Sequence, residues 1–214
     1  MPDNCRKKQL WFDIFQQYLL KQFGDFMKIN SFLLFLSLTI PPYTAAAPEQ
    51  VPPLNPLKTS YPPRLDGVLD DTVWQQAPSV TGFSSWYPDF KNSMSQKTRV
   101  WYAYDRDNLY FAFRCFDTAP HLIKSSVSAR DKMRSDDWIC LNIDTFNDQQ
   151  GLYAFYVNPD GIQGDSRAIG SHEDLSMDFV WYSRGKIDEQ GYCVEVRIPL
   201  KSIRYEKNDS GVSL

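Results

Sequence analysis

Apolar and polar positions alternate with a period of two through much of the chain after residue 60. Residues 98–104 are rich in β-branched and aromatic side chains, and residues 109–116 alternate strictly. One face of that second segment carries Leu109, Phe111, Phe113 and Cys115. Residues 105–108, Asp-Arg-Asp-Asn, supply turn chemistry between the two segments. The pattern therefore predicts a β-hairpin.

Further strands are predicted at 138–144, 152–157, 179–187 and 192–198, with turns at 147–148, 158–161 and 188–191. Helical periodicity over ten residues is absent after residue 60, so we expect only short helical turns, at 70–76 and 200–203. Many short strands separated by turns favour an all-β fold, an antiparallel β-sandwich of the immunoglobulin or jelly-roll type. The apolar run that begins at 212–214 breaks off, so we expect the sandwich to lack its last strands.

The first 63 residues differ in pattern from the rest. Met27 and Lys28 precede an apolar run at 32–40 and small residues at 44–47, which is typical of a signal peptide spanning 27–47. The run is too short for a bilayer, which needs about 20 residues, and Pro41-Pro42 argues against a buried core helix. We interpret 1–26 as an upstream mis-start segment, 48–63 as a proline-rich linker and 64–214 as the domain. An exported protein of the periplasm, outer membrane or extracellular space is expected.

Composition narrows the function. Hydrophobic residues make up 43% of the 214 residues, and the formal net charge is −3. The hydrophobic fraction is sufficient for a packed core, and the negative net charge gives no sign of a basic surface that would bind nucleic acid. We therefore expect no nucleic-acid partner.

The sequence contains no arrangement of residues that is typical of a catalytic site. The two histidines, His121 and His172, lie in polar stretches without metal-ligand spacing, and the sequence contains no phosphate-binding loop or nucleophile elbow. The sequence thus predicts a protein that is not itself an enzyme. Cys115, Cys140 and Cys193 are an odd number for a disulfide framework. We interpret Cys115 as a buried thiol. A single disulfide between two of the three cysteines is an open alternative.

Two other residue classes could form a binding site. Carboxylates near strand ends, above all Asp144 and Asp148, suit calcium, although solvated turn residues are an equally simple reading. Exposed aromatic rings can stack on sugars: Trp86 lies in a loop-like stretch, and Trp181 is followed by Tyr182. Trp74 and Trp101 are interpreted as core residues.

Four segments in order carry a resemblance to a known family. Residues 65–74 read Leu-Asp-Gly-Val-Leu-Asp-Asp-Thr-Val-Trp, and segments 104–111, 136–144 and 191–199 follow. Together they resemble the domains of carbohydrate-binding module family 9 over about residues 61–205. Segments 147–149 and 157–165 are similar to a branch in which the module precedes an outer-membrane β-barrel region.

This resemblance implies a β-sandwich, glycan binding, frequent bound calcium, and attachment to glycoside hydrolases or cell-surface proteins. Family members that bind sugars carry a Trp shortly before the acidic strand entrance and a Glu inside that strand. Here the matching neighbourhood, residues 133–137, reads Met-Arg-Ser-Asp-Asp without a Trp, and Cys140 stands about where the Glu would be. We therefore expect sugar contacts from Arg134, Asp136, Asp137, Trp86 and Trp181.

Two functions follow as hypotheses. The first is a non-catalytic carbohydrate-binding module of an exported protein, binding a polysaccharide or oligosaccharide in polysaccharide breakdown or uptake. Any hydrolase activity would then belong to an attached region. The second is a structural or interaction cap of an outer-membrane β-barrel protein, without sugar binding, and the missing Trp favours it. A downstream membrane or hydrolase region of the full-length protein is the expected partner.

Overall fold

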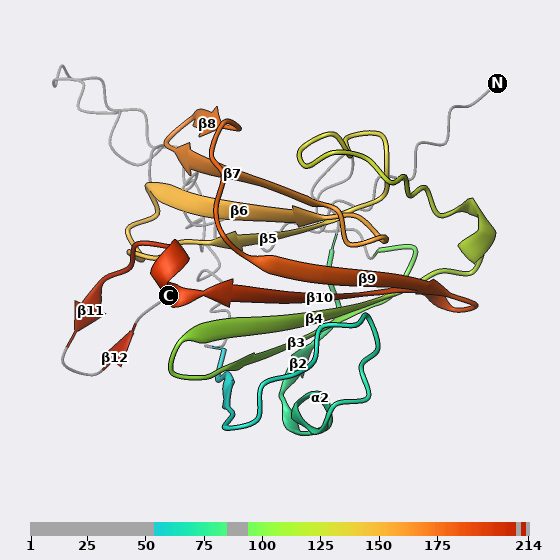
Figure 1. Cartoon of the computed structure of the whole chain (residues 1–214), viewed down its shortest axis with the longest axis horizontal. Coiled ribbons are helices and arrows are strands. Elements are labelled where there is room, and N and C mark those ends of the chain that lie inside the picture. The colour runs from blue at the N-terminus through green and yellow to red at the C-terminus, as the bar shows by residue number, and fades with distance from the viewer. Residues whose placement is uncertain (1–53, 85–93, 209–210, 213–214) are drawn as a thin grey trace, which may run out of the picture. The chain divides into compact units, whose positions relative to one another are not determined.

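Two β-sheets packed face to face form the domain (Figure 1). The computed structural model describes residues 54–84, 94–208 and 211–212. The predicted mis-start segment, the signal peptide, residues 48–53 of the linker and Trp86 lie outside these residues. Within the described residues, no helix is long and apolar enough to cross a membrane.

The first sheet has the strand order β1-β3-β4-β10-β9, and β2 also pairs with β3. Its strands are β1 (Leu57–Lys58), β2 (Ser79–Val80), β3 (Thr98–Tyr104), β4 (Asn108–Phe116), β9 (Tyr182–Asp188) and β10 (Gly191–Pro199). The long strands β3, β4, β10 and β9 pair antiparallel, whereas β1 runs parallel to β3. The predicted hairpin is confirmed as β3 and β4.

The second sheet has the strand order β5-β6-β7-β8 and is antiparallel throughout. Its strands are β5 (Ile139–Ile143), β6 (Gly151–Val157), β7 (Gln163–Ile169) and β8 (His172–Asp174). A small hairpin follows, formed by β11 (Lys207–Asn208) and β12 (Gly211–Val212). The remaining elements are helix α2 (Thr72–Gln76) and the 3-10 turns η1 (Pro120–Leu122) and η2 (Leu200–Ser202). Both predicted short helical turns are thereby confirmed.

The core lies between the sheets. Phe113 of β4 and Val194 of β10 face Leu141 of β5 and Phe155 of β6 within one buried cluster. Removing these apolar faces from water is the main stabilising contribution. The sandwich predicted from the alternation is confirmed.

The outer face of the first sheet is buried too, which the alternation did not predict. Tyr110 and Ala112, assigned to the face opposite the core, are 1% and 0% exposed. Segment 57–77 covers them and places Val73 and Trp74 in a second buried cluster. A covering layer of this kind is invisible to a period-two pattern because it comes from a distant part of the chain.

Several strands were not predicted, β7 and β8 among them, and the predicted start of another strand was wrong. Strand β7, Gln-Gly-Asp-Ser-Arg-Ala-Ile, was missed because its polar sequence lacks a hydrophobic alternation. Strand β9 begins at Tyr182 rather than at residue 179, because residues 179–181 approach the core as a loop. Cys115, Cys140 and Cys193 are buried and none is part of a disulfide, so the bridge left open by the sequence does not form in this structure.

Candidate functional site

A pocket of about 560 Å³ opens beside the turn between β3 and β4. Four parts of the chain line it: residues 106–108 of the turn, Tyr182 of β9, residues 197 and 199–201 from β10 and η2, and Tyr205. Its size lies within the range of about 300–1,000 Å³ that ligand pockets occupy. The pocket thus offers the size and the aromatic walls that a small ligand requires.

The turn that forms one wall is fixed by Asp105. Its carboxylate accepts hydrogen bonds from the backbone N–H groups of Asp107 and Asn108, both at 2.7 Å, and from the Tyr110 hydroxyl at 2.5 Å. Burial raises the pKa of Asp105, but these hydrogen bonds outweigh it and the net shift is downward. The Leu200 N–H donates to the Asp107 carbonyl at 2.8 Å, which joins η2 to the turn.

Tyr182 and Arg197 form the opposite wall. They are cross-strand partners in the register of β9 and β10, and the Arg197 guanidinium carbon lies 4.2 Å from the centre of the Tyr182 ring. The ring is anchored by this cation–π contact, yet Tyr182 remains 44% exposed. An anchored and exposed aromatic ring is well suited to stack on a sugar.

Two predicted sugar contacts bind the protein itself instead. Asp136 is 6% exposed and accepts hydrogen bonds from the Ser126 N–H and hydroxyl and from Asn158 Nδ2. Asp137 accepts the Lys124 N–H at 3.0 Å. Both carboxylates join the loop before β5 to neighbouring segments. Arg134 is exposed on that loop.

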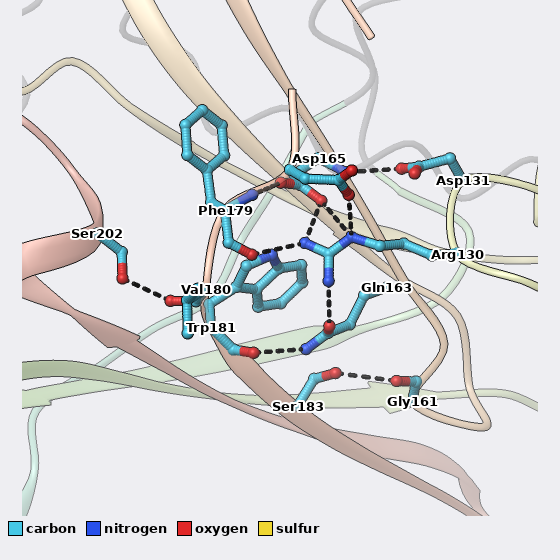
Figure 2. Close-up of polar contacts among 11 residues, drawn as sticks. Arg130, Asp131, Gly161, Gln163, Asp165, Phe179, Val180, Trp181, Ser183 and Ser202 are labelled. Carbon is cyan, nitrogen blue, oxygen red and sulfur yellow. Dashed lines mark hydrogen bonds and ion pairs between the residues drawn. The ribbon is translucent and has the colours of Figure 1, made fainter. Parts of the chain in front are cut away.

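Trp181 is buried, which corrects the expectation of an exposed ring. It is 3% exposed and packs edge-on against Phe155 at 5.1 Å. Figure 2 shows Arg130 next to it, and the guanidinium carbon is 5.8 Å from the centre of the Trp181 ring. Trp181 lies in the loop that precedes β9, and this loop turns the ring toward the core.

Arg130 is the centre of the cluster in Figure 2. Its guanidinium forms an ion pair with Asp165, and it donates to the Gln163 side chain at 2.8 Å and to the Phe179 carbonyl at 2.9 Å. Burial raises the pKa of Asp165 more than the Phe179 N–H and Arg130 lower it. The cluster joins the loop before β5, strand β7 and the loop before β9.

Three carboxylates of this region could hold a metal ion. Oxygens of Asp131, Asp165 and Asp178 lie within 4.8 Å of one another, and an all-oxygen set suits a hard cation such as calcium. Arg130 pairs with both Asp165 and Asp178, so its single positive charge offsets one of the three negative charges.

The calcium ligands predicted from sequence lie elsewhere. Asp144 is 4% exposed and accepts the Phe146 and Gln149 N–H groups at 3.2 and 2.8 Å, whereas Asp148 accepts the Gln150 N–H at 2.9 Å. In this structure both cap the turn between β5 and β6. Their role as metal ligands stays a prediction.

The neighbourhood 133–137 and Cys140, for which the family resemblance implies a Trp and a Glu, is partly covered. Met133 is 5% exposed and Cys140 is 2% exposed. A Cβ atom added to Gly164 of β7 would lie 3.0 Å from the Met133 Cε methyl, so this side chain packs on the second sheet. Neither residue presents an aromatic or carboxylate group to solvent.

Sequence reasoning missed most of the pocket. The sequence pattern indicates the turn at 105–108 and the aromatic Tyr182 separately. It gives no sign that Arg197 and Tyr205 belong to a site. Turn residues ahead of a strand and an aromatic at a strand start were the available signals. The sequence does not reveal that segments about 90 residues apart meet.

Residues 65–214 match the family described as "Carbohydrate family 9 binding domain-like". Among solved structures, a carbohydrate binding module family 9 from Caldicellulosiruptor kristjanssonii in complex with cellotriose aligns with TM-score 0.50 and 17% identity, covering 72% of each chain. The same module in complex with glucose gives TM-score 0.49 and 17% identity over 72% of this chain and 73% of that one.

A protein from Bacteroides uniformis ATCC 8492 aligns with TM-score 0.53 and 8% identity, covering 70% of this chain and 72% of that one. At such identities the likeness concerns the fold. No sequence among curated proteins matches the chain significantly.

Proposed function

Because the chain belongs to the carbohydrate family 9 binding domain-like family, we propose that its β-sandwich is a non-catalytic module that holds a saccharide in the pocket beside Tyr182. The observation that carries this proposal is the exposed Tyr182 ring, anchored by Arg197 on the wall of a pocket of about 560 Å³. The Caldicellulosiruptor kristjanssonii module of the same family is in complex with cellotriose, which supports glycans as the ligand class.

In this proposal the saccharide stacks its C–H face on Tyr182, with Tyr205 as a second aromatic wall. The Asn108 side chain lines the same pocket and donates to Asp105 at 3.2 and 3.3 Å through Nδ2. Its carbonyl oxygen is thereby oriented as an acceptor for a sugar hydroxyl. Stacking and directed hydrogen bonds are the two contacts on which sugar recognition depends.

Affinity measurement on the full chain tests the proposal. Isothermal titration with a panel of oligosaccharides should give binding that Tyr182→Ala weakens by about 5- to 150-fold, which corresponds to about 1–3 kcal/mol for one stacked ring. Tyr61→Ala is the matched control, since Tyr61 is an 84% exposed tyrosine that does not line the pocket. Equal losses in the two variants would contradict the pocket as the site.

The cellular role is part of the proposal. The signal-like segment at 27–47 supports export, where the module would tether a partner region to polysaccharide during breakdown or uptake. N-terminal sequencing of the secreted protein tests this, and retention of residues 1–26 would count against the start at Met27.

A second candidate function is an interaction cap without sugar binding. It is favoured by the lack of a Trp in residues 133–137 and by the burial of Cys140, which stands about where the resemblance implies a Glu. A folded protein that binds no member of a broad glycan panel would support this cap and overturn the carbohydrate-binding proposal.

A further inference from the structure

The pocket beside Tyr182 carries an excess of positive charge. Arg106, Arg197 and Lys201 line it, with Asp107 as the only lining carboxylate. The whole chain has a formal net charge of −3, so this local balance runs against the average of the protein. A basic concave surface attracts anionic ligands.

These three cations differ from the paired arginines elsewhere in the domain. Arg64, Arg114 and Arg130 each form an ion pair with an aspartate. Within the part of the chain that the structure describes, Arg106, Arg197 and Lys201 form none. Their charges are therefore available to a ligand.

Arg197 is held at the pocket wall by an aromatic ring and not by a carboxylate of the described residues. Its Nε is buried and has no hydrogen-bond partner among the described residues, and a buried donor left without an acceptor costs about 1–3 kcal/mol. The guanidinium lies against the Tyr182 ring at 4.2 Å. The residue also lines the pocket, so an anion bound there would meet the guanidinium at the pocket wall.

The carboxylate of Asp105 is engaged with its own turn. Asp105 follows strand β3 at the base of the turn, and its carboxylate accepts from the Asp107 and Asn108 backbone, the Asn108 amide and the Tyr110 hydroxyl. It does not form a salt bridge with Arg197. Among the described residues, Arg197 therefore has no paired carboxylate.

We propose that this pocket binds an anionic saccharide, whose ring stacks on Tyr182 and whose carboxylate or sulfate is held by Arg197, Arg106 and Lys201. This inference rests on the proposed carbohydrate-binding function and names its ligand class. Arginine matches the geometry of planar carboxylates through two parallel N–H donors, and lysine adds a point charge. A neutral sugar would leave the three cations without a counter-charge.

Isothermal titration of the full chain with an oligogalacturonate and its methyl ester tests the charge alone, because the two ligands share the same sugar rings. The acid should bind at least about tenfold more tightly than the ester, and added NaCl should weaken only the acid. A second titration uses a sulfated oligosaccharide, and the two affinities show whether the pocket prefers a carboxylate or a sulfate.

Variants locate the site. Arg106→Gln and Lys201→Gln should each weaken the acid by about tenfold, since each removes a charge-assisted contact, and should weaken the ester less, so that the preference for the acid falls. Arg197→Lys keeps the charge but removes the fork, so it should weaken the carboxylated ligand more than the sulfated one. Lys132→Gln, an exposed lysine outside the pocket, is the control.

The outcomes separate this inference from the proposed function. Equal affinity for acid and ester, with Tyr182→Ala weakening both, would overturn the anionic preference and leave carbohydrate binding intact. Binding of no saccharide at all would overturn both. If sodium sulfate or acetate alone bound as tightly as the anionic sugars, the pocket would be a simple anion site and the inference would fail.

Discussion

Glu195 of β10 accepts a hydrogen bond of 2.8 Å from the indole Nε1 of Trp74, a residue 121 positions earlier in the chain. The same carboxylate accepts the Asp66 and Gly67 N–H groups at 2.9 and 2.8 Å. Glu195 is 0% exposed, so this one side chain fastens the covering segment to the outer face of the first sheet. The Asp-Gly and Trp of the family-like opening therefore serve structure rather than ligand binding.

Removing either partner should destabilise the domain. Glu195→Ala leaves three N–H donors without their acceptor, and we expect a loss of about 3 kcal/mol in the free energy of unfolding. Trp74→Phe keeps an aromatic ring and removes one donor, at a cost of about 1–2 kcal/mol. Urea unfolding of both variants and the double variant gives the coupling between the two residues. Strict additivity of the two losses would contradict the bond.

Gly67 should resist substitution for two reasons that a second glycine separates. It has φ +79° and an added Cβ would lie 2.8 Å from the Lys186 Cβ, whereas Gly82 has φ +81° with nothing within 4 Å. Gly82→Ala should cost about 1 kcal/mol through backbone strain, and Gly67→Ala should cost clearly more through the added collision. Thermal unfolding of the two variants measures the difference, and equal losses would show that the contact relaxes freely.

The Arg114–Asp188 pair should make stability depend on pH. Arg114 donates to both Asp188 oxygens, at 2.6 and 2.9 Å, and this hydrogen bonding is the main cause that lowers the pKa of Asp188 from its usual 3.8. A lowered pKa in the folded state gives stability above pH 3.8 that is lost as the pH falls through the lowered value.

Asp188→Asn should therefore be less stable than the native protein at pH 6, and the two should converge as the pH approaches 2. The side chain of Asp188 is 44% exposed, so solvent screening keeps the effect below about 1 kcal/mol. Urea midpoints between pH 2 and pH 6 measure it. A difference that stays constant with pH would contradict the ion pair.

Calcium should change the unfolding temperature only when Arg130 is removed. In the native protein the guanidinium pairs with Asp165 and Asp178, so CaCl₂ and a chelator should leave the unfolding temperature unchanged. Arg130→Gln should lose about 3 kcal/mol, because the side chain of Asp165 is fully buried. Calcium should restore part of that loss by binding the three carboxylates. Destabilisation of the native protein by the chelator would show that a metal displaces Arg130.

The local pattern of apolar and polar residues was sufficient to predict much of the first sheet. Residues 98–104 and 192–198 alternate because one face of each strand meets the core, and the Asp-rich stretch at 105–108 can only turn. Strand β7 escaped prediction because Asp165 and its polar neighbours are buried through partners on other segments. The same limit hid Glu195, which sequence alone would place on a solvent face.

The sequence by itself determined that the chain forms a β-sandwich of this family, because alternation and turn residues act between near neighbours. Only the tertiary structure decided which aromatic is exposed and which polar groups meet. Trp181 and Tyr182 are adjacent, yet the first, in the loop before β9, packs in the core and the second, at the start of β9, lines the pocket. Arg106, Arg197 and Lys201 gather there because strand pairing joins distant segments, and no local preference encodes that meeting.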